Sequence, residues 1–283
     1  MRSKILAMIA AVVLPIGMAA QNGKPTAADY QNLKSTKTMV VVDDNMFSDY
    51  NAAIKTYMAS DWKITEFEFI SRKKFEQRKG DPSYSFLMTT NGYYRDDDSK
   101  EKYTYLSLLM GKKGAQINTM PDLISIPLCY SATTDQTYVY KMLAFMRFML
   151  NHVEKVNNDP KLVSDSPLVQ YRKDKKSLAN KTLYLIKSEL AKDIQSEKAI
   201  KKVYPYKFKF VGEDEIKQAI EEKDESVVFL HKVGPEKSKK KALCFTMIMG
   251  AADSQVYFFD YHKINGKNPD CLRAKDLESM AKN

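Results

Sequence analysis

The segment Lys37-Thr38-Met39-Val40-Val41-Val42 has a counterpart later in the chain, Lys181-Thr182-Leu183-Tyr184-Leu185-Ile186. Both are short apolar runs bounded by polar residues, a pattern that predicts buried strands. Three further pairs of segments follow in the same order and at nearly the same spacing: residues 66–70 with 207–211, 86–87 with 229–230, and 102–111 with 241–250. We therefore predict an internal duplication, with two unrelated α/β halves as the alternative.

Helical patterns separate the predicted strands. After the first strand, apolar side chains recur at helical spacing, with Asn45 as the expected N-cap: Phe47, Tyr50, Ile54, Tyr57 and Met58. A shorter helix is expected over residues 73–78, and three more strands complete the unit. This order predicts an α/β or α+β fold made of two similar mixed-sheet units in tandem.

A long apolar helix is predicted to connect the two units. Residues 134–156 carry apolar side chains around most of the helix circumference, with Lys141 and Arg147 as charged exceptions. The apolar stretch is too short and too charged to cross a membrane, so we expect a helix buried between the units. The predicted organisation is a first unit over residues 21–156, a linker over 157–180 and a second unit over 181–283.

Residues 1–20 have the features of a signal peptide. Arg2 and Lys4 precede a short apolar stretch, and Ala19 and Ala20 supply small residues for cleavage. We expect an exported protein, periplasmic or extracellular after cleavage, with no membrane span in the mature chain. A retained N-terminal anchor is the alternative.

Composition excludes several classes of protein. Hydrophobic residues make up 44% of the 283 residues and charged residues 28%, which rules out a wholly disordered, collagen-like or multi-span membrane chain. The formal net charge is +10 at pH 7. The basic residues are spread along the chain, and the run over residues 237–241 is interpreted as a solvated loop, so nucleic acid is not expected as a partner.

Cysteine usage argues against a disulfide framework, although export would permit one. The chain has three cysteines, Cys129, Cys244 and Cys271, which cannot all pair with one another. We expect Cys129 and Cys244 to be buried free thiols inside strands. A bridge that involves Cys271 stays open, because nothing in the spacing selects it.

Common catalytic motifs do not occur in the sequence. The chain has no glycine-rich phosphate motif, no G-x-S-x-G and no H-E-x-x-H, so no cofactor, metal or catalytic residue is predicted. We expect His152 to be packed within the long helix. His231 and His262 end matching strands and would share a site only if the fold brings them together.

Two pairs of residues are candidates for binding. Asp43 and Asp44 close the first predicted strand, where open α/β sheets bind ligands. Carboxylates there suit a divalent cation or acid–base catalysis, but Asn45 makes a turn and a helix cap the simpler interpretation. Tyr93 and Tyr94 are a candidate exposed contact pair, with core positions at a strand end as the alternative.

The aligned copies also invert their charges at five positions. We predict that these residues pair across the copies if the units face each other, with independent solvated faces as the alternative. The aligned pairs are Glu66 with Lys207, Glu68 with Lys209, Arg72 with Glu213, Lys73 with Asp214, and Lys74 with Glu215.

Function is predicted only as a class. The leading hypothesis is an exported, non-catalytic binding or assembly protein of the cell envelope that uses a cleft or face between the copies. Its expected partner is another envelope protein or an anionic ligand. The alternatives are a carboxylate- or metal-dependent hydrolase that uses Asp43 and Asp44, and a carrier of an anionic small ligand.

Overall fold

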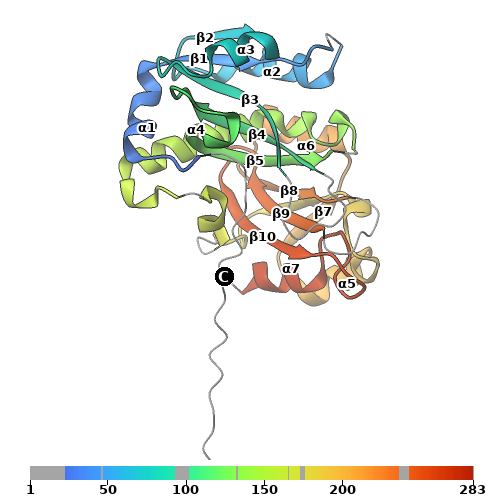
Figure 1. The fold of residues 1–283 in the computed structure, drawn as a ribbon. Helices are drawn as coiled ribbons and strands as arrows, with labels where there is room; N and C mark the ends of the chain where they lie inside the picture. The colour runs from blue at the N-terminus through green and yellow to red at the C-terminus, as the bar shows by residue number, and fades with distance from the viewer. Residues whose placement is uncertain are drawn as a thin grey trace, which may run out of the picture.

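The computed structural model describes residues 23–45, 47–92, 102–131, 133–164, 166–172, 176–235 and 242–282. Within them the chain forms two five-stranded mixed sheets with helices between and around them (Figure 1). The predicted fold class is thus confirmed. The proposed signal peptide, the Tyr93-Tyr94 pair and the basic run over 237–241 lie outside the described residues.

The first unit contains α1, α2, α3, α4 and the first sheet, in the strand order β2-β1-β3-β4-β5. Its helices and strands are α1 (Ala27–Asn32), β1 (Lys37–Val41), α2 (Asp49–Asp61), β2 (Phe67–Ile70), α3 (Arg72–Arg78), β3 (Tyr84–Gly92), β4 (Tyr103–Met110), β5 (Asp122–Tyr130) and α4 (Met142–Asn158). Short 3-10 helices lie between them: η1 (Leu33–Ser35), η2 (Ile117–Thr119), η3 (Asp135–Thr137) and η4 (Val139–Lys141).

The second unit repeats this topology. Its sheet has the order β7-β6-β8-β9-β10, and each strand pairs in the same sense, parallel or antiparallel, as its counterpart in the first sheet. The elements are β6 (Thr182–Leu185), η7 (Lys187–Glu189), η8 (Lys192–Ile194), α5 (Glu197–Val203), β7 (Lys207–Phe210), α6 (Glu213–Glu221), β8 (Val227–Val233), β9 (Leu243–Gly250), β10 (Val256–Lys263) and α7 (Ala274–Ala281).

The strand registers differ between the copies by one residue. Thr38 of β1 pairs with Phe67 of β2, whereas Thr182 of β6 pairs with Lys207 of β7; the sequence alignment places Phe208 there. A one-residue shift moves every side chain of a strand to the opposite face. Phe67 and Phe69 accordingly pack on the core between the units, whereas Phe208 and Phe210 pack on the outer cluster of the second unit.

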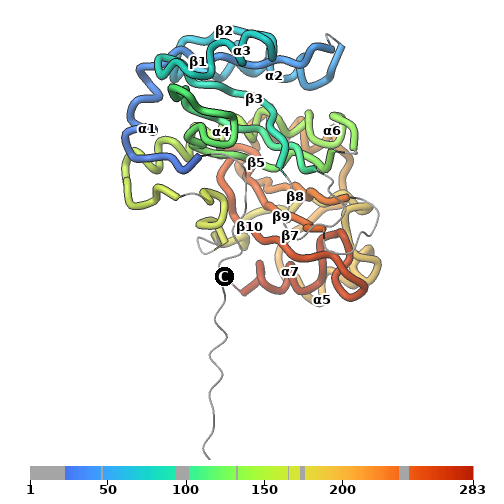
Figure 2. The backbone as a smooth tube through the Cα atoms, viewed as in Figure 1, coloured from blue at the N-terminus to red at the C-terminus, as the bar shows by residue number. Residues whose placement is uncertain are grey.

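The two units share one hydrophobic core. Side chains from α2, α4 and α6 lie in it together with residues of both sheets, while α3 covers the outer face of the first sheet and α5 and α7 that of the second (Figures 1 and 2). Tyr103 at the start of β4 joins the sheets, because its hydroxyl donates to the Leu243 carbonyl at 2.9 Å and accepts from the Leu243 amide at 2.7 Å.

The connecting helix is shorter than predicted. The backbone over 135–141 forms η3 and η4, and the regular helix α4 begins at Met142. Tyr138, with φ −137° and ψ −19°, separates the two 3-10 turns and prevents a continuous helix. The helix is buried between the units as expected. Arg147 in α4 bonds to Asp61 of the first unit and to the Ile220 carbonyl of the second.

The predicted linker is packed rather than loose. Its described residues include two 3-10 helices, η5 (Pro160–Leu162) and η6 (Pro167–Arg172), and Leu168 and Tyr171 are buried in the shared core. Arg172 forms an ion pair with Asp260 of β10 at 2.6 Å. This segment therefore fixes the end of the first unit against the second sheet.

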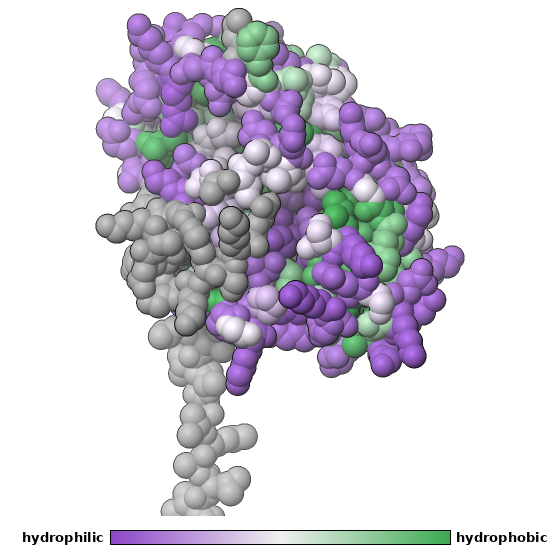
Figure 3. Space-filling view, turned by 90° about the vertical axis from the view of Figure 1, so that its right-hand side faces the viewer, coloured by the Kyte–Doolittle hydropathy of each residue, from purple (hydrophilic) through white to green (hydrophobic). Residues whose placement is uncertain are grey.

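The face of the molecule in Figure 3 is mostly hydrophilic, and hydrophobic side chains show in several smaller areas among the hydrophilic ones. Every helix within the described residues is too short or too polar to span a bilayer.

Candidate binding pocket between the two units

Asp43 belongs to a closed turn after β1. Its Oδ1 accepts from the Asn45 amide at 2.8 Å, and Asn51 donates from Nδ2 to the carbonyls of Asp43 and Asn45. Asp43 and Asp44 are both exposed. The N-cap of α2 is Ser48, which accepts from the Asn51 amide, and not Asn45 as predicted. Local hydrogen bonds thus place Asp43 in a turn, as the turn interpretation of this residue predicts.

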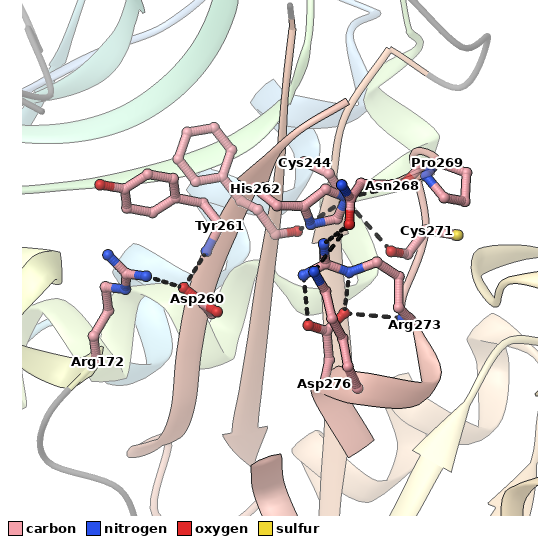
Figure 4. A network of polar contacts seen from close by, with 12 residues as sticks. Arg172, Cys244, Asp260, Tyr261, His262, Asn268, Pro269, Cys271, Arg273 and Asp276 are labelled. Carbon is pink, nitrogen blue, oxygen red and sulfur yellow. Dashed lines mark hydrogen bonds and ion pairs between the residues drawn. The ribbon is translucent and has the colours of Figure 1, made fainter. Parts of the chain in front are cut away.

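The three histidines lie in separate environments. His152 Nδ1 lies 3.0 Å from the Tyr171 hydroxyl, and burial lowers the pKa of its ring to about 3, so it is the packed histidine that the sequence predicts. His231 Nε2 faces the Pro127 carbonyl and His262 Nε2 the Pro269 carbonyl, each at 2.8 Å. Figure 4 shows His262 beside the Arg273–Asp276 ion pair, which closes the start of α7.

Four of the ten charge-inverted residues, Glu68, Lys74, Lys209 and Glu215, form ion pairs within their own unit. Glu68 pairs with Lys37 and Lys74, and these two lysines lower the pKa of Glu68 to about 2, with Lys74 the stronger influence. Lys209 pairs with Glu215 at 3.2 Å. The register shift also places Lys207 opposite Thr182 where the first copy has Phe67. Pairing across the copies therefore has no support from these contacts.

A pocket of about 380 Å³ opens between the two units. It lies at the carboxyl ends of β5, β6 and β8, the position at which α/β sheets bind ligands. Its size falls within the range of small-molecule sites, about 300–1,000 Å³. Both units supply its walls: Leu128, Cys129, Tyr130, Thr133, Thr137 and Tyr140 from the first, and Ile186, Ser188, Glu189, Glu213, Lys232, Val233, Gly234 and Asp270 from the second.

Lys141 is a buried cation next to this pocket. The residue is 0% exposed, and its Nζ has no hydrogen-bond partner among the described residues. It lies 4.7 Å from the centroid of the Tyr140 ring. Burial lowers its pKa, and Glu189 and Glu213, both in the pocket wall, oppose that effect. Lys141 does not itself line the pocket, but two of the lining carboxylates act on its ammonium.

The start of α4 adds to the cost of this charge. Lys141 occupies the N-cap position of the 17-residue helix α4, where the helix dipole is positive and favours anions over cations. By contrast Arg147, the other charged exception of this segment, has both an ion pair and a carbonyl partner. A buried ammonium without a hydrogen bond is expensive to maintain, which makes Lys141 the strongest functional candidate in the described chain.

Glu189 is the complementary group. Its Oε2 is buried and has no hydrogen-bond partner among the described residues. Burial raises the pKa of Glu189, against the lowering effects of Lys141 and Lys232. Glu213, the first residue of α6, lies in the same wall. The pocket wall thus contains a carboxylate with one buried oxygen that has no hydrogen bond in the described chain.

Lys232 and Asp270 form the fixed part of the wall. Their ion pair is 3.0 Å long, and their side chains are 9% and 2% exposed. Burial alone would lower the pKa of Lys232, but Asp270 raises it above its usual value. Cys244 and Cys271 lie behind this pair as free buried thiols, and burial raises the pKa of Cys271 to about 11. With Cys129, all three cysteines are free, so the prediction for Cys129 and Cys244 is confirmed.

An acidic groove adjoins the pocket between α2 and α6. Tyr140 and Glu213 line both hollows. Asp49, Asp214 and Glu221 line the groove, and Lys217 is its basic residue. The mouth of the inter-unit region is therefore acidic, although the whole chain is basic. Groups of His, Cys, Asp and Glu arranged to hold a metal ion are not found within the described ranges.

The pocket lies at the same edge of its sheet as the residues that the sequence singled out, but in the second copy. The rule about carboxyl ends pointed to Asp43 and Asp44 after β1, whereas the pocket lies after β6, at Ser188 and Glu189. The sequence feature that marked Lys141 was its charge within an otherwise apolar segment. Comparison of the chain with family models, curated proteins and solved structures gives no match.

Proposed function

We propose that this chain is an exported, non-catalytic binding protein that takes a small polar ligand into the pocket between its two units. The observation that carries the proposal is the pocket itself, which residues of both copies line and whose wall contains Glu189, a carboxylate with a buried Oε2 that has no hydrogen-bond partner among the described residues. Folded proteins rarely leave buried polar atoms unsatisfied, and those that remain gather at functional sites.

The pocket lining favours this proposal over an anion carrier. Three carboxyl residues line it, Glu189, Glu213 and Asp270, against one lysine that is already paired. The adjoining groove is acidic as well. A ligand with a cationic group therefore suits the site better than a purely anionic one. The hydrolase alternative has no comparable support, because the contacts of Asp43 are those of a turn.

A melting experiment tests binding. The purified protein is heated alone and with a small-molecule extract of its own cells, and so are the variants Ser188→Trp and Thr56→Trp. Ser188 is an exposed residue of the pocket, and Thr56 an exposed residue of the adjoining groove. We expect the extract to raise the melting temperature of wild type and Thr56→Trp but not of Ser188→Trp. No shift for wild type, or an equal shift for all three proteins, would refute the proposal.

Export has its own test. Mass spectrometry of the protein recovered from outside the cytoplasm should find a chain that begins at Ala20 or Gln21, as cleavage after Ala19 or Ala20 predicts. A full-length chain that starts at Met1 would contradict export by cleavage. The binding proposal does not depend on this result.

A further inference from the structure

The outer edges of the two sheets carry complementary chemistry. Within the described residues, β2 pairs with β1 alone and β7 pairs with β6 alone, so each edge strand has one open side. We propose that the β2 edge of one molecule pairs antiparallel with the β7 edge of a second copy of this chain, so that molecules join head to tail. This inference goes beyond the proposed function and does not depend on the pocket.

The backbone groups on the open sides belong to phenylalanines. The Glu66 carbonyl accepts from β1. Because successive residues of a strand direct their backbone groups to opposite edges, Phe67 directs its amide and carbonyl away from β1. The Val211 amide donates to β6, so Phe208 directs its groups outward by the same alternation. Phe67 opposite Phe208 is therefore a hydrogen-bonded antiparallel pair, in which each residue both donates and accepts.

The same register matches the side chains on both faces. Residues directly opposite each other in a ladder lie on the same face, and pairs of opposite charge or of aromatic rings stabilise it. Glu66 and Lys207 are exposed and form no ion pair with another described residue, so both are free to pair between molecules. The three opposed pairs are Glu66 with Lys209, Phe67 with Phe208, and Glu68 with Lys207.

The helices show that the charged faces can meet only in the antiparallel sense. Lys74 of α3 bonds to Glu68, and Glu215 of α6 bonds to Lys209. In each unit the charged face of the edge strand is thus the face that the following helix covers. The two sheets have the same topology and crossovers of one hand. Bringing their outer edges together with these faces on one side requires half a turn within the sheet plane, which makes β2 and β7 antiparallel.

The inverted charges select head-to-tail contacts. Two β2 edges would place carboxylates opposite carboxylates, and two β7 edges would place lysines opposite lysines. Proteins commonly use charged edge strands to prevent such pairing, and here like edges repel while unlike edges attract. Because each molecule has one edge of each kind, the contact is heterologous and builds open chains or closed rings.

Light scattering coupled to size-exclusion chromatography tests this contact over a series of protein concentrations. We expect the mass of the wild type to rise above that of one chain as the concentration rises. Glu66→Lys and Lys207→Glu should each weaken association about tenfold, because each places like charges opposite one another. The matched controls are Lys161→Glu and Glu278→Lys, exposed charges on η5 and α7, which should associate as wild type does.

A mixture of the two edge variants is the decisive measurement. Glu66→Lys keeps a native β7 edge and Lys207→Glu keeps a native β2 edge, so an equimolar mixture should form a dimer and no larger species. Amide exchange of the wild type should slow over residues 66–70 and 207–211 as its concentration rises.

Four results would overturn the inference: a wild type that stays monomeric at every concentration, edge variants that associate as wild type does, a mixture that stays monomeric, or slowed exchange outside both edges alone. Melting curves that match the controls would show that both edge variants fold.

Discussion

Replacement of Lys141 by methionine should make the protein more stable. Met has an unbranched side chain of similar length, so it fills the space of the lysine stem without the ammonium. Lys141 is 0% exposed and its Nζ has no hydrogen bond in the described chain. Replacement of a whole buried ion pair by apolar side chains of similar volume is often neutral or stabilising, by up to about 1–4 kcal/mol, and we expect a gain within that range for this single unbonded charge. Each kcal/mol corresponds to about 2–4 °C in melting temperature at this chain length.

The pH dependence of the free energy of unfolding tests the sign of this stability change independently. Burial lowers the pKa of Lys141 below 10.5 in the folded state, so between these two pKa values the unfolded chain binds the extra proton. Stability of the wild type should therefore rise with pH in this window, by up to about 1.4 kcal/mol per pH unit. Glu189, Glu213 and Lys232 also act on this group, so the relevant quantity is the difference between wild type and Lys141→Met. That difference should shrink as the pH rises.

Denaturant unfolding followed by the fluorescence of Trp62, the single and buried tryptophan, measures both effects. Curves at pH 7 and pH 9 are needed for wild type, Lys141→Met and the exposed control Lys217→Met. The control should stay within about 0.5 kcal/mol of wild type. If Lys141→Met loses 1 kcal/mol or more at pH 7, the ammonium stabilises the folded protein and our reasoning about an unsatisfied charge is wrong.

Three further predictions concern other parts of the fold. Acidification below pH 6.5 should destabilise the protein, because burial lowers the pKa of His152 and of His231 to about 3 and the unfolded chain takes up the protons; urea midpoints at pH 4.5 and 6.5 that coincide would contradict this. All three thiols should react with a thiol reagent only after unfolding, and a thiol that reacts in the native protein would show that one of them is accessible. The double variant Asp43→Asn with Asp44→Asn should melt within about 0.5 kcal/mol of wild type and keep its ligand, because Asn also offers an oxygen to the Asn45 amide; loss of binding with an unchanged melting temperature would revive a functional role for these residues.

The topology was accessible from sequence because each strand is a distinct apolar run. The four aligned segments fall on equivalent strands of two sheets with the same order. The register was not accessible, because Phe67-Glu68-Phe69 and Phe208-Lys209-Phe210 have the same alternation and differ only in the face they present. Which face is buried depends on packing against the other unit, and a local pattern does not contain that information.

The pocket was less predictable than the sheets. Its residues come from β5 and the segment after it, the segment after β6, the first residue of α6, the end of β8 and the loop before α7, and they converge only when the units pack. Lys141 was noticed as an exception in an apolar segment, but Arg147 was an equal exception and proved to be fully paired. Three-dimensional contacts were needed to distinguish a structural charge from an unsatisfied one.

Hydrogen–deuterium exchange with and without the stabilising extract tests the central claim most directly. We predict slower exchange in two separate regions at once, residues 133–140 of the first unit and residues 186–189 of the second, because both line the pocket. Protection confined to one unit, or located at the turn after β1, would contradict a binding site built between the two copies.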